Sequence, residues 1–405
     1  MSRINDKNGS RVSGFGVRAM ALVAMLAPCA LFAGNWTLDT STGVLTSENG
    51  EWSLSGCALA NQKLTVGAVT AAAADGILDF RSAKVNNTSV SVVTFNRGTG
   101  KWKTAAIKEF YCDRFDRLEK QMLQGNTTIE KIWIGTLDTL TAFESAFEGC
   151  TSLREVHFGA PLNNFYAKSF YNCNQLDMDI ADLVAANTSS VAKQGLTSCR
   201  KLHGKLTLTN TGNFYLGSFS GVGVEEVVIN SPNITGWQNT AFKNCSSLTN
   251  LVVICPNLTS IAHSGSAFDG CTALRKITLD IPNMSSFDTQ HSAAHFFGAC
   301  SALSEVVIKN APWTDSEGNS LVRSWLNRHL LSAVTPVAAT VDAPKNCTIY
   351  ALRSDYKPYA SAMMGDYERP NAPKRCYGVY VSGSSRLAYM VQDPDYRPGF
   401  FISAK

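Results

Sequence analysis

The sequence lacks both an apolar run long enough to cross a membrane and a strong excess of charge. Its longest apolar run, Ala19–Ala33, is shorter than the ~20 residues that a membrane-spanning helix needs. The formal net charge is +4 over 405 residues, and four basic residues and one acidic residue in the first 33 account for +3 of it. The remainder is close to neutral, which argues against the broad basic surface of a nucleic-acid-binding protein.

The sequence also lacks the short motifs that mark familiar catalytic and metal sites. It contains no C-x-x-C, G-x-S-x-G, H-E-x-x-H or P-loop pattern. Gly221-Val222-Gly223 is a lone G-x-G without the third glycine that a G-x-G-x-x-G motif requires. His291 and His295 have a spacing that can place two imidazoles on one helix face, but no adjacent acid or third ligand accompanies them. We therefore expect a protein that is not an enzyme and uses no metal or cofactor.

The N-terminal residues have the pattern of an export signal. Residues 1–18 are polar and basic, and the short apolar run Ala19–Ala33 follows, with small residues at Ala30 and Ala33. This order is typical of a secretory signal peptide, and we expect cleavage after Ala33. A lipid anchor is the alternative, because LAPC at 26–29 resembles a bacterial lipobox. Either way, the sequence predicts a secreted or cell-surface protein with no transmembrane helix in the mature chain.

A repeat runs through the middle of the chain. AFEGCTSLREVHFGAP at Ala146–Pro161 returns as AFKNCSSLTNLVVICP at Ala241–Pro256 and as AFDGCTALRKITLDIP at Ala267–Pro282. The shared pattern is A-F-x-x-C-x-x-L-x-x-h-x-h-x-x-P, where h is apolar, and weaker copies fill the gaps. Self-similarity at this period is the signature of a repeat architecture. The anchor positions, 23 to 29 residues apart, are Asn126, Cys150, Cys173, Cys199, Val222, Cys245, Cys271 and Cys300.

Each part of the repeat predicts a piece of local structure. The L-x-x-h-x-h segment is short, alternating and rich in Val and Ile, which predicts a strand with one buried face. A proline such as Pro256 ends that strand, because it has no N–H to give a ladder. Phe, Cys and Leu at i, i+3 and i+6 predict a short helical segment. Stacked units bury these side chains in continuous ladders, so we predict an α/β repeat solenoid with a parallel sheet on one face.

These units resemble the leucine-rich repeats of the BspA type, which occur in bacterial surface and secreted proteins. The resemblance covers about Leu123 to Pro312. Trp36–Trp52 is similar to a segment that often precedes such arrays, and Cys347–Ala362 is similar to one that often closes them. The resemblance implies a solenoid and a role in binding or adhesion, and it implies no catalytic set.

The same observations divide the chain into four regions. We expect a signal peptide at 1–33, a β-rich N-terminal capping region at 34–122, about eight repeats at 123–312 and a small α+β C-terminal cap at 313–405. Within this last region the pattern predicts an amphipathic helix in 313–332, a linker at 333–346, and a hairpin formed by Cys376–Val381 and Arg386–Gln392.

The cysteines of the repeat share one position, which predicts a structural role. That position also accepts Val222, so it behaves as a place for a small buried hydrophobe. A ladder of equivalent side chains does not converge on one point, as a metal site must. Cys347 and Cys376, both in the C-terminal region, are the candidate disulfide.

The exposed side of the repeat strands is the candidate binding face. Side chains alternate along a strand, so the residues between the buried positions point outward. They are mixed in charge and include one tryptophan. An equally good interpretation is that they only keep the strands soluble. The residues expected on this face are Lys131, Trp133, Glu155, His157, Lys205, Thr207, Glu226, Val228, Asn250, Val252, Lys276, Thr278, Glu305 and Val307.

Three functions remain open from the sequence. The first hypothesis is an exported, non-enzymatic repeat protein that binds a protein or glycan at a cell surface or matrix, because a broad shallow face suits such partners. The second is a structural envelope or matrix component without a specific ligand. The third is the targeting arm of a secreted hydrolase, for which neither flank offers a catalytic motif. The pattern does not predict the oligomeric state.

Overall fold

The computed structural model divides the chain into two compact units, Met1–Phe32 and Ala33–Lys405. It describes residues 34–96, 102–237, 240–261, 267–284, 286–287, 300, 302–303, 305–310, 348–351, 377–380 and 387–392. The predicted signal peptide, the pair His291 and His295, the predicted C-terminal helix and linker, and the candidate disulfide Cys347–Cys376 lie outside these residues. No helix within the described residues has the length and apolar character needed to span a membrane.

The described chain begins with a small, mostly antiparallel sheet. Its order is β6-β3-β2-β1-β8-β9, and only β1 and β8 pair in parallel. Trp36 and Leu45 of this sheet are buried in the same hydrophobic core as the repeats. The strands are β1 (Asn35–Asp39), β2 (Val44–Ser47), β3 (Ser53–Ser55), β6 (Ala68–Ala71), β8 (Lys84–Val85) and β9 (Thr88–Ser89).

A nine-stranded sheet follows, and all its pairs except β4–β5 are parallel. The long strand β12 pairs with β13 at its beginning and with β14 at its end, so it belongs to two sides of the coil. The strands are β4 (Ala58–Ala60), β5 (Lys63–Val66), β7 (Ile77–Asp79), β10 (Val92–Phe95), β11 (Glu109–Leu118), β12 (Lys131–Ala142), β13 (Glu155–His157), β14 (Asn164–Phe165) and β15 (Ser190–Val191).

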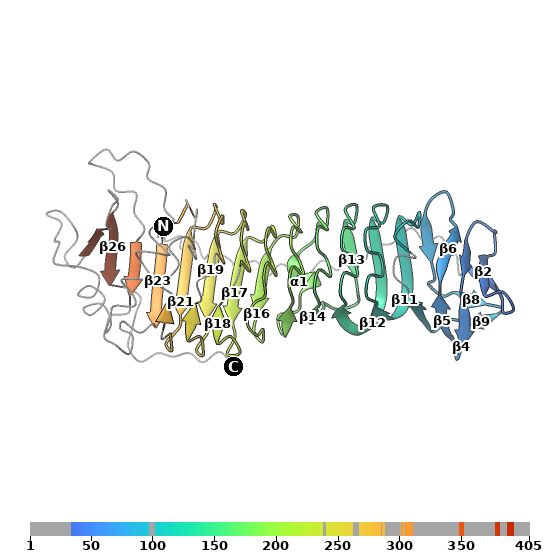
Figure 1. Ribbon diagram of the computed structural model, residues 1–405, viewed down its shortest axis with the longest axis horizontal. Helices are drawn as coiled ribbons and strands as arrows, with labels where there is room; N and C mark the ends of the chain where they lie inside the picture. The colour runs from blue at the N-terminus through green and yellow to red at the C-terminus, as the bar shows by residue number, and fades with distance from the viewer. Residues whose placement is uncertain are drawn as a thin grey trace, which may run out of the picture. The chain divides into compact units, whose positions relative to one another are not determined.

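Two further sheets continue the stack (Figure 1). One has the order β16-β17-β19-β21-β23-β24-β26-β25 and is parallel except for the terminal β25–β26 pair; the other, β18-β20-β22, is parallel throughout. The strands are β16 (Lys205–Leu208), β17 (Glu226–Asn230), β18 (Gly236–Trp237), β19 (Asn250–Ile254), β20 (Ser260–Ile261), β21 (Lys276–Asp280), β22 (Ser286–Phe287), β23 (Glu305–Asn310), β24 (Thr348–Ala351), β25 (Tyr377–Tyr380) and β26 (Leu387–Gln392).

One short helix interrupts the strands. α1 (Ile180–Leu183) lies between β13 and β16, where a further strand would otherwise continue the sheet (Figure 1). Asp179 caps it, because its side chain accepts a hydrogen bond from the N–H of Ala181 at 2.9 Å. Ile180 and Leu183 are buried, so the helix still contributes to the core ladders.

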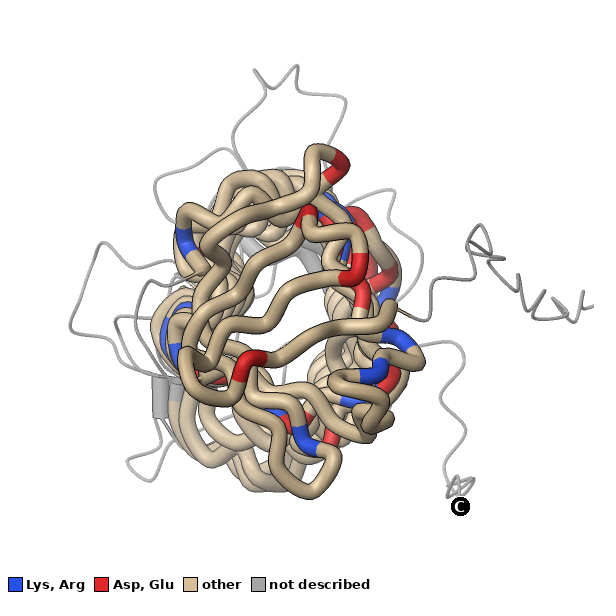
Figure 2. Tube along the Cα trace, turned by 90° about the vertical axis from the view of Figure 1, so that its right-hand side faces the viewer, with Lys and Arg blue, Asp and Glu red and all other residues tan. Residues whose placement is uncertain are grey.

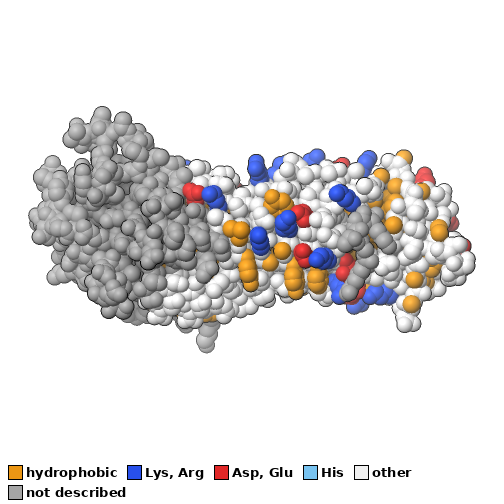
Figure 3. Space-filling view, in the orientation of Figure 1, with side chains coloured by type: hydrophobic (Ala, Val, Ile, Leu, Met, Phe, Trp, Pro, Cys, Tyr) orange, Lys and Arg blue, Asp and Glu red, His pale blue; other side chains and the backbone are white. Residues whose placement is uncertain are grey.

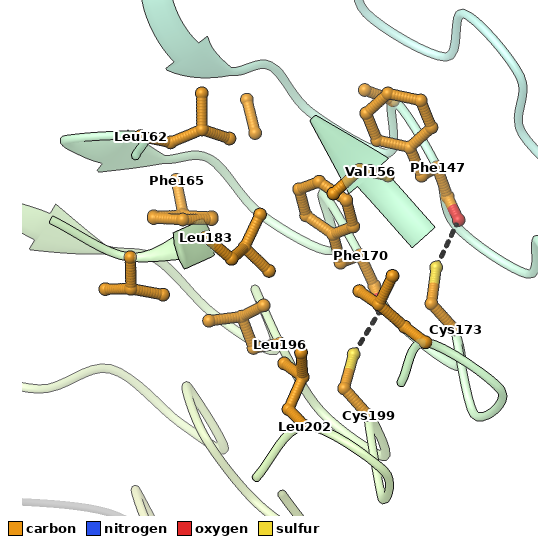
Figure 4. Packing of buried hydrophobic residues seen from close by; sticks show 14 of the residues in the cluster. Phe147, Val156, Leu162, Phe165, Phe170, Cys173, Leu183, Leu196, Cys199 and Leu202 are labelled. Carbon is orange, nitrogen blue, oxygen red and sulfur yellow. Dashed lines mark hydrogen bonds between the residues drawn. The ribbon is translucent and has the colours of Figure 1, made fainter. Parts of the chain in front are cut away.

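The core consists of ladders of equivalent side chains (Figure 4). The Phe219 and Phe242 rings stack with centroids 5.0 Å apart, and Phe268 stacks on Phe242 at 5.2 Å. The equivalent position accepts Leu196 in one coil, which is also fully buried. Each repeat therefore packs on its neighbours, as the repeat pattern predicts.

The F-x-x-C-x-x-L segment forms turns in place of the predicted short helix. Within a coil, Cys150 donates its N–H to the carbonyl of Phe147. The N–H of Phe147 itself donates to Ser169 of the next coil, and that of Gly149 to Tyr171. Donors that alternate between the turn and the next coil leave no continuous i to i−4 ladder. The repeat solenoid with a parallel sheet is therefore confirmed, with almost no helix: α1 alone within the described residues.

Viewed along the stack, successive coils lie over one another with charged residues at their rims (Figure 2). The parallel pairing of the nine-stranded sheet begins with β5 and β10, which precede residue 123. The antiparallel pair β25–β26 lies where the sequence predicts a hairpin. The division into capping and repeat regions at 122 and 312 stays a prediction.

Candidate binding face

The structure brings the predicted face residues together as two rows on neighbouring parallel strands. Lys131 lies beside Glu155, and Trp133 lies beside His157. On the far side of α1, Lys205, Glu226, Asn250, Lys276 and Glu305 form one row, and Thr207, Val228, Val252, Thr278 and Val307 form the other. Because α1 separates β13 from β16, the face has two parts, an N-terminal segment on β7, β11, β12 and β13 and a C-terminal segment on β16 to β23.

The charges of the C-terminal segment are largely paired with each other. The Lys205 ammonium lies 3.1 Å from Glu226, and Lys276 lies 2.5 Å from Glu305. The Asn250 amide donates to Glu226 at 3.4 Å. Exposed pairs of this kind contribute about 0–1 kcal/mol to stability, and they leave little net charge for a partner. This segment fits the interpretation of a solvated strand surface.

The N-terminal segment has a different character, because its outer row is aromatic. The Trp133 and His157 rings stack with centroids 5.6 Å apart and an angle of 12° between their planes. Trp133 is half-buried and His157 is exposed. Beside them, Lys131 and Glu155 form an ion pair of 3.0 Å. Parallel strands in register place equivalent side chains about 4.8 Å apart, which is why the two rings meet.

Two residues of earlier strands extend this aromatic row. β11 places Tyr111 beside Trp133, and β7 places Asp79 beside Tyr111. The Arg81 guanidinium lies 4.3 Å from the centre of the Tyr111 ring and 5.9 Å from that of Trp133. Asp79 holds it there through an ion pair of 2.5 Å. The stacked row of the N-terminal segment is thus Arg81, Tyr111, Trp133 and His157.

The charge states of Arg81 and Tyr111 are fixed by their neighbours. The hydrogen bonds that the Arg81 guanidinium donates to Asp79 raise the pKa of Arg81, so the guanidinium stays charged. Burial, together with the hydrogen bond that the Tyr111 hydroxyl donates to Glu109, raises the pKa of Tyr111 well above its usual value. The row therefore combines a permanent cation with a neutral phenol that is already engaged as a donor.

The position of the Trp133 indole depends on a glycine in its own strand. A Cβ placed on Gly135 would lie 3.1 Å from the Cη2 atom of Trp133 and 2.7 Å from the carbonyl oxygen of Asp113. The indole thus lies over Gly135, where any side chain would displace it. This lets a large ring lie along the strand and remain half-buried.

Sequence reasoning missed Asp79, Arg81, Glu109 and Tyr111, because β7 and β11 carry no complete F-x-x-C-x-x-L motif. A signal was present in the alternation itself. EFYC at 109–112 and KIWI at 131–134 share one pattern of outward charge, buried residue, outward aromatic and buried residue. Aligning these two alternating segments as neighbouring strands pairs Tyr111 with Trp133.

The repeat cysteines have no exposed or reactive thiol. Cys150 and Cys199 are buried, and burial raises the pKa of each to about 12. Their thiols donate hydrogen bonds to carbonyl oxygens of the preceding coil, at 3.2 Å to Leu123 and 3.2 Å to Phe170. Among the described residues, no cluster of three His, Cys, Asp or Glu side chains is arranged to hold a metal ion.

The fold and the repeat together define a leucine-rich-repeat protein of the solenoid class. The model of the BspA-type leucine-rich repeat region matches residues 116–249 and 213–319, in six copies. The chain belongs to this family.

Two solved structures share features with the chain. One is a leucine-rich cell surface protein from Faecalibacterium prausnitzii, with 12% identity, a TM-score of 0.29, and coverage of 79% of this chain and 97% of that one. The other is a leucine-rich repeat protein from Bacteroides ovatus, with 11% identity, a TM-score of 0.30, and coverage of 77% and 98%. At these TM-scores neither likeness bears on function. No curated protein matches the chain significantly.

Proposed function

We propose that this is an exported, non-enzymatic repeat protein that recognises a partner at a cell surface or matrix through the N-terminal segment of its strand face. The observation that carries the proposal is the stacked row of Arg81, Tyr111, Trp133 and His157. Tryptophan, tyrosine and arginine are the residues most enriched among those that dominate binding energy at interfaces. The C-terminal segment offers no such cluster among its described side chains.

The orientation of the row favours a protein partner over a glycan at this segment. The Trp133 and His157 rings turn their faces toward each other, and the Arg81 guanidinium lies over Tyr111. Sugars stack on exposed ring faces, and Tyr111, Trp133 and His157 each have one face against a neighbour. The ring edges and the guanidinium offer N–H donors to the carbonyl and carboxylate groups of a protein surface.

An array of matrix proteins and glycans, probed with the secreted chain, tests this function. We expect Trp133→Ala and Arg81→Ala each to weaken the affinity for the protein partner about thirtyfold, the loss typical of a dominant interface residue. Thr278→Ala and Lys276→Ala lie on the C-terminal segment of the same face and are the matched controls. If no partner binds, or if the control pair weakens binding as much as the first pair, the proposal is wrong and a structural matrix component becomes the better description.

Export is the second part of the proposal, and it rests on the basic leader and short apolar run at 1–33. N-terminal sequencing of secreted material should begin near Gly34. Retention of Met1 in material that stays inside the cell would contradict it. Acylation of Cys29 would instead favour the lipid-anchored alternative.

The ends of the repeat array need protection, because an open solenoid end exposes apolar surface and a sheet edge. We propose that residues 34–122 and 313–405 supply the two caps. In support, Trp36 and Leu45 of the N-terminal region are buried in the same core as the repeats.

A further inference from the structure

A second row of outward side chains lies on a different side of the coil, just after β14 and β15. Lys168 donates its N–H to the carbonyl of Lys193, and Gln194 donates to Leu216. This register makes Tyr166, Ala192 and Tyr215 equivalent positions on three successive coils. The bond from Ser145 to Ala167 places Phe143 on the coil before them. We call Phe143, Tyr166, Ala192 and Tyr215 the side row.

Three of the four side-row residues are aromatic, and Ala192 leaves a gap among them. Phe143 and Tyr166 stack with centroids 5.3 Å apart and 7° between their planes. Tyr166 is 46% exposed and Tyr215 is 53% exposed. Coils about 4.8 Å apart put these tyrosines about 10 Å from each other. A ring seated over Ala192 would lie about 5 Å from each, which is within stacking distance.

The backbone around the gap is held in place by a buried serine. The Ser218 hydroxyl donates to the carbonyl of Val191 at 2.8 Å and accepts the N–H of Tyr215 at 3.2 Å. Ser218 is fully buried. On the other side, Tyr166 is supported by its stack on Phe143. The Tyr166 ring and the backbone of Tyr215 are therefore positioned before any ligand arrives.

The charge beside the gap is positive. Lys193 follows Ala192 and is exposed, and no acidic side chain in the described part of the chain pairs with it. The neighbouring Lys168 is neutralised by Glu148 at 3.0 Å. The nearby Glu144 is paired with Lys120 at 2.7 Å. Figure 3 shows a line of hydrophobic side chains with Lys and Arg side chains beside it over the middle of the coils.

We propose that the gap over Ala192 binds one pyranose ring of a glycan that carries carboxylate groups. A pyranose chair presents C–H groups to both tyrosine faces and its hydroxyl groups to solvent, and it is thicker than a flat aromatic ring, which suits the gap. Lys193 then pairs with the carboxylate. Because the ring plane then lies across the stack, the glycan chain enters and leaves the gap across the coils and not along them. This site shares no residue with the strand face.

Titration with β-1,4-linked oligoglucuronate, whose chairs leave C–H groups on both faces, tests the proposal, with the neutral cello-oligosaccharide of the same linkage as the matched probe. Ala192→Tyr fills the gap with a residue that the adjacent coils already carry, so the fold should be kept while oligoglucuronate binding is lost. We expect Tyr215→Ala to weaken binding about tenfold, the effect of losing one stacking contact. Lys193→Ala should remove the preference for the acidic probe, and Trp133→Ala should change nothing.

Each other result overturns the proposal. Oligoglucuronate that fails to bind, or that binds Ala192→Tyr as well as the natural chain, shows that the gap is not a sugar site. Equal binding of the acidic and neutral probes shows that carboxylates are not recognised. Loss of binding in Trp133→Ala places the glycan on the strand face instead. Binding of an aromatic peptide, blocked by Ala192→Tyr, assigns the gap to a protein side chain.

Discussion

The thiol of Cys245 donates a hydrogen bond to the backbone carbonyl of Phe219 in the preceding coil, 3.2 Å away. The same bond recurs down the ladder, from Cys173 to Phe147 at 3.0 Å and from Cys271 to Phe242 at 3.3 Å. The carbonyl of Phe219 also accepts the N–H of Val222 within its own turn. The thiol is therefore a second, weaker donor to a group that is already paired.

This relationship predicts how the repeat cysteine tolerates change. Cys245→Val should lower the free energy of unfolding by less than about 1 kcal/mol, because the Phe219 carbonyl keeps its bond from Val222. Cys245→Asp should be severe, because it buries a charge without a partner. Thermal melts of the two variants compare them directly. Equal losses would mean that the thiol has a chemical role that neither hydrogen bonding nor packing explains.

The phenylalanine ladder should fail locally. Phe242 stacks on both Phe219 and Phe268, and Phe242→Ala should cost about 3–5 kcal/mol. Because each coil contacts only its neighbours, hydrogen exchange should accelerate around β17, β19 and β21 before it does in β1 to β3. Phe143→Ala, on the outer surface, is the control and should cost less than about 1.5 kcal/mol. Uniform acceleration along the whole chain would argue against independent coils.

Asn126 should be the most sensitive anchor position. Its side-chain amide donates to the carbonyls of Trp102 at 2.8 Å and Ala105 at 3.0 Å, and its oxygen accepts the N–H of Ile129 at 2.9 Å. It is fully buried. Asn126→Ala leaves the buried N–H of Ile129 without its partner and removes one of the two hydrogen bonds to each carbonyl, and it should cost about 3 kcal/mol.

Asn257→Ala is the matched control for Asn126→Ala, because the Asn257 amide makes a single exposed bond to Pro232 at 2.9 Å. Its loss should lower the free energy of unfolding by less than about 1 kcal/mol. Urea unfolding of both variants measures the difference. Similar losses would show that burial of the Asn126 bonds is unimportant.

Alkaline pH should destabilise the solenoid through its buried thiols. Burial raises the pKa of Cys150 and Cys199 from 9.0 to about 12, so the folded chain keeps protons that the unfolded chain loses. The stabilisation is complete below pH 9 and is lost between about pH 9 and 12, at up to about 1.4 kcal/mol per pH unit for each thiol. Urea unfolding at pH 7, 9 and 10.5 measures this fall. The double variant Cys150→Val, Cys199→Val should show a shallower fall, and an unchanged slope would contradict the assignment.

The sequence predicts the ladders of buried side chains well and the backbone conformation of the turns less well. Because Val222 occupies the cysteine position in one repeat, the sequence predicts that this position is buried and structural. Cys245 and Cys271, at the same position in their repeats, are fully buried. The turns were not predictable from spacing, because Phe, Cys and Leu at i, i+3 and i+6 fit a helix as well as a turn. What decides between them is the N–H of Phe147, which bonds to Ser169 of the next coil.

The binding face shows the same division. Alternation correctly identifies Trp133 and His157 as outward neighbours. The sequence did not reveal Arg81, because its place over Tyr111 depends on which strand lies next to β11, and β7 comes from a part of the chain without the motif. Which strands lie next to each other depends on the tertiary structure. The sequence predicts it only where the complete repeat motif is present.

The direction of the bonds between coils has a consequence for how such a gene changes in length. Each repeat cysteine donates back to the coil before it, while turn N–H groups such as that of Phe147 donate forward to the coil after it. Every coil thus offers the same donors and acceptors at its two ends. Insertion or loss of one complete coil joins matching ends, whereas a partial coil leaves buried groups unmatched. Copy number in this array should therefore vary between relatives in whole repeats, with the irregular residues gathered where coils turn.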